Sequence, residues 1–161
     1  MTADARLTQA AADLGHSFDG ELRIGGDYVP LVRDGDVIYV SGQIPRVGNS
    51  VVVTGRVGAE VDLARAQLAA RICVMRALVF LQRELGSLEQ VRQILRITVY
   101  VRSAPAFSQQ SEVADAASQL LRQVLEGAGA HTRTSVGVLQ LPKDASVELD
   151  LIASAKASTE G

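Results

Sequence analysis

The sequence has 161 residues, a formal net charge of −2 and 47% apolar residues. This length is close to the usual size of one domain, and the apolar content excludes a disordered protein. The 16 basic residues are spread along the chain, and tryptophan is absent. Nucleic acid is therefore not an expected partner, because its binding needs a basic patch or stacking aromatic side chains.

The sequence gives no sign of export or of a membrane segment. Cys73 is the only cysteine, so no disulfide can form within the chain, and its apolar neighbours predict a buried thiol. The first fifteen residues lack the pattern of a signal peptide. No apolar stretch approaches the ~18–20 residues that a membrane span needs. The simplest interpretation is a cytoplasmic protein without membrane contact.

The first third of the chain predicts a helix followed by short strands. Apolar residues at three- and four-residue spacing predict a helix over Ala3–Leu14 that ends at Gly15. Asp34–Asp36 is a turn sequence between two apolar runs, which predicts a hairpin of Val29–Val32 with Val37–Ser41. Another short strand is expected at Val51–Val53.

The remaining chain predicts two helices and three strands. Val61–Leu85 has a helical stripe of apolar residues, in which Arg76 takes a solvated position. Strict alternation predicts a strand over Leu95–Arg102. A second helix is expected to start near Pro105 and to end near Gly127. The last two strands, joined by a turn at Pro142–Asp144, are expected at Thr134–Leu141 and Ser146–Ala153.

This order predicts an α+β fold, with a mixed sheet and two long helices packed on one face. Apolar residues on the other face suggest that an oligomer buries it, and these include Ile38, Val40, Val136, Val138 and Ile152. We expect an N-terminal helical extension at residues 1–20, a single domain at 21–156 and a frayed tail at 157–161.

No metal or cofactor motif is present. His16 and His131 lie far apart, and paired cysteines are absent. The chain has no glycine loop for phosphate and no Gly-x-Ser-x-Gly elbow. We therefore expect no metal and no cofactor.

Three segments carry residues suited to binding a small acid. They are Tyr28 with Ser41–Pro45, then His131–Ser135, and finally Glu148. The guanidinium of Arg133 at the start of a strand offers a fork that matches a carboxylate, and a carboxylic side chain could relay protons. Spacing alone also permits an ion-paired Arg133, a solvated Glu148 and simple turn chemistry at Ser41-Gly42.

Together these segments resemble the RidA/YjgF-like (reactive-intermediate deaminase) family. The resemblance rests on Ser-Gly-Gln-Ile-Pro at 41–45, Thr-Arg-Thr at 132–134, Leu-Pro-Lys-Asp at 141–144 and Val-Glu-Leu-Asp at 147–150. It spans roughly Tyr28 to Ala153 and is strongest to the subgroup labelled endoribonuclease or chorismate-mutase-like YjgF. It implies a chorismate-mutase-like fold and a homotrimer with three sites at subunit interfaces.

The resemblance also implies roles for individual residues. Arg133 would hold a substrate carboxylate, and Glu148 would be linked to the attacking water. The pocket would be shaped by Tyr28, Ser41 and Gly42, and it would include Ser135, which stands where the family often has cysteine. Two further departures from the deaminating branch lie on the second helix, at Ser111 and Ala114.

Three functions follow from the resemblance and its departures. The first is hydrolysis of an enamine or imine of a small carboxylate metabolite to a ketoacid and ammonia. The second is binding or sensing of a 2-ketoacid-like compound without turnover, which the altered helix positions motivate. The third is endoribonuclease activity, which follows from the subgroup label and which the acidic balance of the chain supports little.

Overall fold

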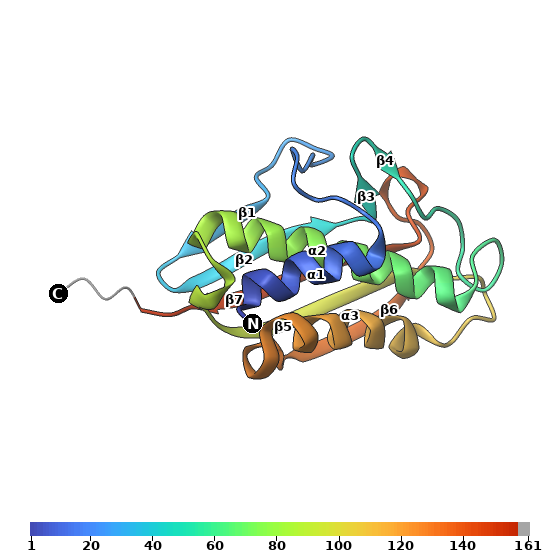
Figure 1. Ribbon diagram of the computed structural model, residues 1–161. Coiled ribbons are helices and arrows are strands. Elements are labelled where there is room, and N and C mark those ends of the chain that lie inside the picture. The colour runs from blue at the N-terminus through green and yellow to red at the C-terminus, as the bar shows by residue number, and fades with distance from the viewer. Residues whose placement is uncertain (158–161) are drawn as a thin grey trace.

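A five-stranded mixed sheet forms the centre of the computed structural model, which describes residues 1–157 (Figure 1). The strand order is β1-β2-β7-β5-β6, and only β5 and β6 run parallel. The strands are β1 (Leu31–Asp34), β2 (Val37–Gln43), β5 (Val91–Arg102), β6 (Thr132–Val138) and β7 (Val147–Ala155). A separate small hairpin joins β3 (Arg46–Val47) to β4 (Ser50–Val51).

Two long helices cover one face of this sheet. Helix α2 (Leu63–Leu85) begins after Asp62, whose side chain accepts a hydrogen bond from the backbone N–H of Arg65. It ends at Gly86, where φ is 82°. Helix α3 (Gln110–Leu125) lies beside it. The described residues also form 3-10 helices at Leu88–Gln90, Glu126–Gly129 and Pro142–Asp144.

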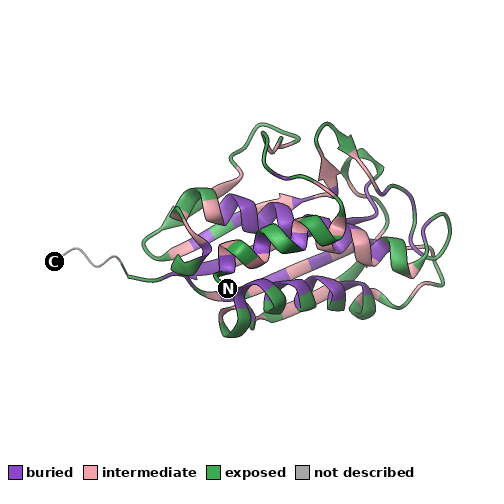
Figure 2. Cartoon of the chain, viewed as in Figure 1, coloured by how far each residue is buried: buried purple, intermediate pink, exposed green. Residues whose placement is uncertain are grey.

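Helix α1 (Ala3–Leu14) packs on the outer side of both long helices. Leu7 and Ala10 are buried in the same core as α2 and α3, and Figure 2 shows α2 buried along most of its length. The helix ends at Gly15 in the left-handed region, with φ at 72°. The helix predicted over Ala3–Leu14 is therefore confirmed with its bounds.

The second face of the sheet is not covered by a helix. In β5 the side chains of Ile97, Val99 and Val101 are buried toward the helices, whereas their alternating neighbours are partly exposed. On the uncovered face Tyr39 is 50% exposed and Val136 is 39% exposed. The mixed α+β architecture with helices on one face is as the sequence predicts.

Two apolar residues that the sequence assigned to the second face lie under the helices instead. Ile38 and Val40 are 0% and 4% exposed and belong to the core. The uncovered face is thus less apolar than expected. The predicted hairpin forms, with the first strand starting at Leu31 and Gly35 in the turn at φ 61°.

Several predicted bounds shift for identifiable reasons. Strand β5 begins at Val91 rather than Leu95, because register irregularities between Val91 and Arg96 break the alternation and leave Leu95 37% exposed. Helix α3 starts at Gln110, well after Pro105, which lies in the preceding loop. Strand β6 covers Thr132–Val138, and the strand expected at Val51–Val53 is only the short β4.

The predicted tail at 157–161 lies, apart from Ala157, outside the described residues. Within residues 1–157, none of the helices has the length and apolar character needed to cross a bilayer.

Candidate functional site

Arg133 lies on the edge strand β6 and points toward helix α3. It pairs with Ile97, a residue buried under the helices, so both side chains leave the same face of the sheet. Its Nη1 lies 2.9 Å from Oδ1 of Asp115 and donates to Oγ of Ser118 at 3.0 Å. Its Nη2 donates to Oγ of Ser111 at 2.8 Å. The guanidinium is thus held in a fixed orientation at the edge of the sheet.

A chain of hydrogen bonds continues from this arginine. His131 Nδ1 lies 2.6 Å from the carbonyl oxygen of Gly129, and its Nε2 lies 2.8 Å from Oγ of Ser118. If Nδ1 carries the proton and donates to Gly129, Nε2 accepts from the hydroxyl of Ser118, whose oxygen in turn accepts from Arg133. Burial lowers the pKa of His131, which favours this neutral form. The neutral form also avoids the repulsion that an imidazolium would meet from the guanidinium of Arg133, which lowers the pKa of His131 further.

Glu148 lies on β7 and points away from the helices. It pairs with Tyr100 on β5 and follows the buried Val147, which faces the core. A methyl group added to Gly42 would lie 2.6 Å from Oε1 of Glu148, so the carboxyl group packs directly on the backbone of this glycine. Only glycine permits this close approach without moving Glu148.

The carboxyl group of Glu148 is shifted toward its neutral form. Burial raises its pKa, and the neighbouring Asp150, two residues along the same strand, raises it further. The hydroxyl of Tyr100 donates to Oδ2 of Asp150 at 3.0 Å. A carboxyl group with a raised pKa beside a cleft is suited to general acid and base chemistry.

A pocket of about 130 Å³ opens next to Glu148. Tyr28 and Gly42, two residues that the resemblance assigns to the ligand site, both line it. Ser41 does not line it but supports it: its hydroxyl donates to the carbonyl of Val29 at 2.8 Å, and its N–H donates to the carbonyl of Pro30. These bonds fix the segment that carries Tyr28. The remaining lining side chains are Arg23, Ile24, Gln43, Ile44, Arg46, Arg76, Pro142 and Lys143, with Gly25.

The basic side chains of this pocket were not predicted from the sequence pattern. Arg76 was assigned to a solvated position, yet it is 2% exposed. The reason is that the segment carrying Arg23 and the β3 strand close over this part of α2, and the carbonyls of Arg23 and Arg46 accept hydrogen bonds from Arg76. Four basic residues that are far apart in the sequence, Arg23, Arg46, Arg76 and Lys143, therefore line one pocket.

The predicted site residues form two groups in one chain. Tyr28, Gly42 and Glu148 meet at the pocket, whereas Arg133 is on the other face of the sheet. Ser135 lies on β6 in register with the buried Val99, so it shares the face of Arg133. A single chain does not bring Arg133 and Glu148 to one ligand.

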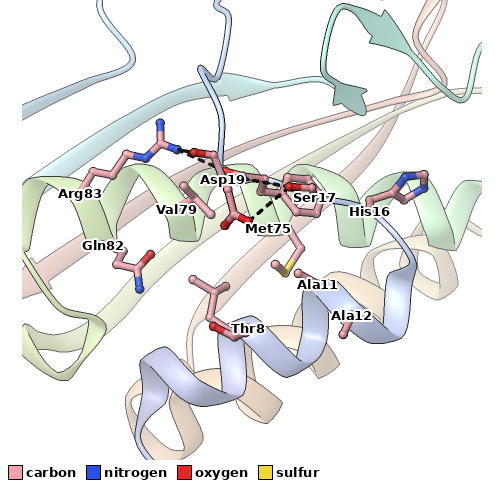
Figure 3. Close-up of a pocket in the computed structure, with 12 residues that line it drawn as sticks. Thr8, Ala11, Ala12, His16, Ser17, Asp19, Met75, Val79, Gln82 and Arg83 are labelled. Atoms are coloured by element: carbon pink, nitrogen blue, oxygen red, sulfur yellow. Dashed lines mark hydrogen bonds between the residues drawn. The ribbon is translucent and has the colours of Figure 1, made fainter.

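A larger hollow of about 400 Å³ lies between α1, the segment after it and α2 (Figure 3). Figure 3 shows Arg83 turned toward Asp19, and its Nη2 donates to the carbonyls of Asp19 at 3.2 Å and Gly20 at 2.7 Å. None of the predicted site residues lines it. Its lining includes His16, Ser17 and Asp19, but its size alone does not make it the site of the predicted residues.

The candidate site offers no metal ligands. Among residues 1–157, no three His, Cys, Asp or Glu side chains lie close enough together to hold a metal ion. Cys73 is buried as predicted, and burial raises the pKa of its thiol, so it is no nucleophile for this site. The chemistry available is that of one carboxyl group and several guanidinium groups.

Comparison with known proteins agrees with this architecture. The chain is 35% identical to Protein TCP17 of Trypanosoma cruzi over 153 residues, which is 94% of this chain and 96% of the relative. The crystal structure of Atu1372 from Agrobacterium tumefaciens, a protein of unknown function, matches with a TM-score of 0.85 and 35% identity over 97% of this chain and 94% of that one.

Two more distant structures show the same fold. A "putative endoribonuclease" from Shewanella oneidensis matches with a TM-score of 0.87 at 24% identity, over 96% of this chain and 99% of that one. The YjgF gene product of Escherichia coli matches with a TM-score of 0.59 at 24% identity, over 81% and 90%. The family model described as Endoribonuclease L-PSP matches residues 20–155. The chain therefore belongs to the Endoribonuclease L-PSP family, which is the family of YjgF and RidA.

Proposed function

We propose that the protein hydrolyses the imine of a small 2-amino acid to the 2-ketoacid and ammonia, at a site completed by two copies of the chain. The observation that carries the proposal is the separation of Glu148, beside Gly42 in a pocket, from Arg133 on the opposite face of the same sheet. Arg133 alone can bind the carboxylate of a substrate, and Glu148 alone can transfer protons, but the reaction needs both. Two copies supply both groups.

A closed ring of subunits would bring Arg133 of one copy next to Glu148 of the neighbouring copy. Arg133 lies on the edge strand, and Glu148 lies on the face without helices. In a closed ring, one surface of each copy meets a different surface of the next, so every interface is equivalent. We expect a homotrimer with three such sites. The exposed apolar side chains of Val32, Tyr39 and Val136 support burial of the uncovered face.

The chemistry needs few groups. The fork of Arg133 binds the carboxylate of the substrate and fixes its imine carbon beside Glu148 of another copy. As water adds to the imine carbon, the Glu148 carboxylate takes one proton from it, and the C=N bond becomes a C–N single bond. The acquired proton passes to nitrogen, which gives a carbinolamine. The proton of its hydroxyl group then moves to nitrogen by way of the Glu148 carboxylate, so that the C–N bond breaks, ammonia leaves and the C=O bond forms. One water is consumed, and no oxidant or cofactor takes part.

A second function, binding of a 2-ketoacid without turnover, is favoured by Ser111, a departure from the deaminating branch whose hydroxyl accepts a hydrogen bond from Nη2 of Arg133. Asp115 already balances the charge that a substrate carboxylate would meet. Its side chain is 53% exposed, however, and exposed ion pairs contribute only ~0–1 kcal/mol, so a ligand can compete with it. The pair weakens carboxylate binding without preventing it, and it does so equally for a substrate and for a 2-ketoacid.

The two functions are separated by measuring ketoacid release. The imine is generated from an amino acid by an oxidase, and the rate of ketoacid formation is compared with the uncatalysed rate. We expect wild type to accelerate release and Arg133→Ala and Glu148→Gln each to abolish the acceleration. Arg56→Ala is the matched control, because Arg56 is exposed and paired with Glu60 outside the pocket. If wild type binds a 2-ketoacid saturably but does not accelerate ketoacid release, the protein binds the compound without turnover.

A further inference from the structure

The most unusual charge in the described part of the chain is the guanidinium of Arg76. It is 2% exposed, and its Nε donates to Oε1 of Gln43 at 2.9 Å. Its Nη1 donates to the carbonyl of Arg46 at 3.1 Å, and its Nη2 donates to the carbonyl of Arg23. All three acceptors are neutral. Among residues 1–157, no carboxylate forms an ion pair with Arg76.

A buried charge of this kind needs compensation. Removing a guanidinium from water without an opposite charge costs several kcal/mol, and buried cations in proteins are ordinarily paired. The surroundings here increase the positive potential, since Arg23, Arg46 and Lys143 line the same pocket. Burial lowers the pKa of Arg76, and the charge of Arg46 acts in the same direction. The pocket is therefore short of negative charge.

Arg76 also retains donors that the protein does not use. A guanidinium has five N–H groups, and the protein accepts three of them, one on each nitrogen. One N–H on each Nη atom is free for a ligand, and Arg76 lines the pocket. Two such donors match the two oxygens of a carboxylate or of a phosphoryl group. The volume of about 130 Å³ accommodates one small group rather than a polymer.

We propose that Arg76, with Arg23, Arg46 and Lys143, binds a second oxyanion group of the ligand, so that the natural ligand is a small diacid. This deepens and rests on the proposed function: the 2-carboxylate binds to Arg133 of one copy, the reacting carbon lies at Glu148, and the distal acidic group enters the basic pocket. Glu148 lines this pocket as well, but it forms no ion pair with Arg76 and so leaves the cation for the ligand.

Calorimetry with a matched pair of ketoacids tests the proposal. 2-Oxoglutarate and 2-oxopentanoate have the same chain, except that a methyl group replaces the distal carboxylate. We expect 2-oxoglutarate to bind the assembled protein about tenfold more tightly, which corresponds to about 1.4 kcal/mol, because its distal carboxylate gains charge-assisted hydrogen bonds. The phosphonate analogue, 2-oxo-4-phosphonobutanoate, shows whether the pocket prefers a phosphoryl group. Equal affinity for all three compounds would overturn the proposal.

Variants assign the effect to the pocket. Arg46→Ala and Lys143→Ala should reduce the ratio of the affinity for 2-oxoglutarate to the affinity for 2-oxopentanoate, whereas Arg56→Ala should leave that ratio as in wild type. Arg76→Lys keeps the charge and removes the fork, so it should lose part of the preference, and thermal unfolding reports whether it folds. Diacid preference that survives in Arg46→Ala and Lys143→Ala would contradict the assignment. Because the readout is binding, an absence of turnover refutes only the proposed hydrolysis and not this site.

Discussion

Arg133 and Glu148 lie two strands apart in one sheet and project from its opposite faces. Both strands pair with β5: Arg133 is in register with Ile97, which faces the helices, and Glu148 with Tyr100, which faces away from them. The two residues that the family resemblance marks as the anchor and the acid–base group therefore cannot act on the same ligand within one chain. Assembly is a requirement of the proposed chemistry.

Asp115 is expected to weaken ligand binding through its contact with Arg133. Replacing it with asparagine removes the competing charge, while the amide can still accept a hydrogen bond from Nη1. Since the pair is partly exposed, we expect Asp115→Asn to tighten ketoacid binding by a few-fold, which corresponds to less than about 1 kcal/mol. Calorimetric titration measures this change.

Glu112→Gln is the control for that experiment, because Glu112 is an exposed residue of the same helix and forms no ion pair with Arg133. It should leave the affinity unchanged. Weaker ketoacid binding by Asp115→Asn would show that Asp115 holds Arg133 in its binding orientation rather than competing with the ligand.

A side chain at position 42 is expected to displace the acid–base group. The Cβ of Gly42→Ala would meet Oε1 of Glu148 at 2.6 Å, so the carboxyl group must rotate. Stability should change by less than about 1 kcal/mol, because only the end of a flexible side chain moves. Turnover should fall on the order of 100-fold, because misplacing a catalytic group by about 1 Å has an effect of this size.

The matched control is Gly20→Ala, whose added methyl would have no neighbour within 4 Å. Thermal unfolding should show that both variants fold. Kinetic measurements should show that only Gly42→Ala loses activity. Equal activities of Gly42→Ala and wild type would place the reacting centre away from Glu148.

The pH dependence of turnover should report the environment of Glu148. Its pKa is raised by burial and then by Asp150, and the carboxylate is the form that accepts a proton from water. Activity should therefore rise with pH through the raised pKa. Asp150→Asn removes the like charge, so the rising limb of kcat/KM should move to lower pH.

Asp34→Asn on the edge strand β1 is the control, because Asp34 is exposed and lies outside the pocket. It should leave the pH profile in place. If the limb in Asp150→Asn coincides with that of wild type, the titrating group is not Glu148.

Stability should depend on pH through His131. Burial lowers the pKa of this histidine below its ordinary value of 6.5, so the unfolded chain binds the proton first as the pH falls. The contribution of His131 is therefore fully present above about pH 6.5 and decreases as the pH falls toward the folded-state pKa. Unfolding by denaturant at several pH values measures the slope, which should be smaller in His131→Asn. An unchanged slope would exclude His131 as the titrating group.

Local signals explain which parts of the fold the sequence predicted. Helix α1 has both its apolar spacing and a glycine at its end, and the hairpin has a glycine in its turn, so short-range chemistry determines them. Strand β5 was predicted too short, because the alternation near Leu95 is broken by pairing with β7, which a linear pattern does not contain.

The sequence identified the residues at the Glu148 pocket only in part, again for a physical reason. Tyr28, Gly42 and Glu148 lie in or near the motifs of the resemblance, and all three line one pocket. Arg76 has the spacing of a solvated helix position, and it is buried by segments 30 and 53 residues away that contribute carbonyl acceptors. Nor does spacing reveal that Arg133 and Glu148 face opposite sides, since this depends on the strand order.

Complementation between two inactive variants tests most directly whether the site is shared between copies. Arg133→Ala and Glu148→Gln chains carrying different tags are co-expressed, and oligomers with both tags are purified. In a mixed ring of three, one interface joins an intact Glu148 to an intact Arg133, so we predict about a third of the wild-type activity. Mixed oligomers as inactive as either parent, alongside an active wild type, would contradict the shared site.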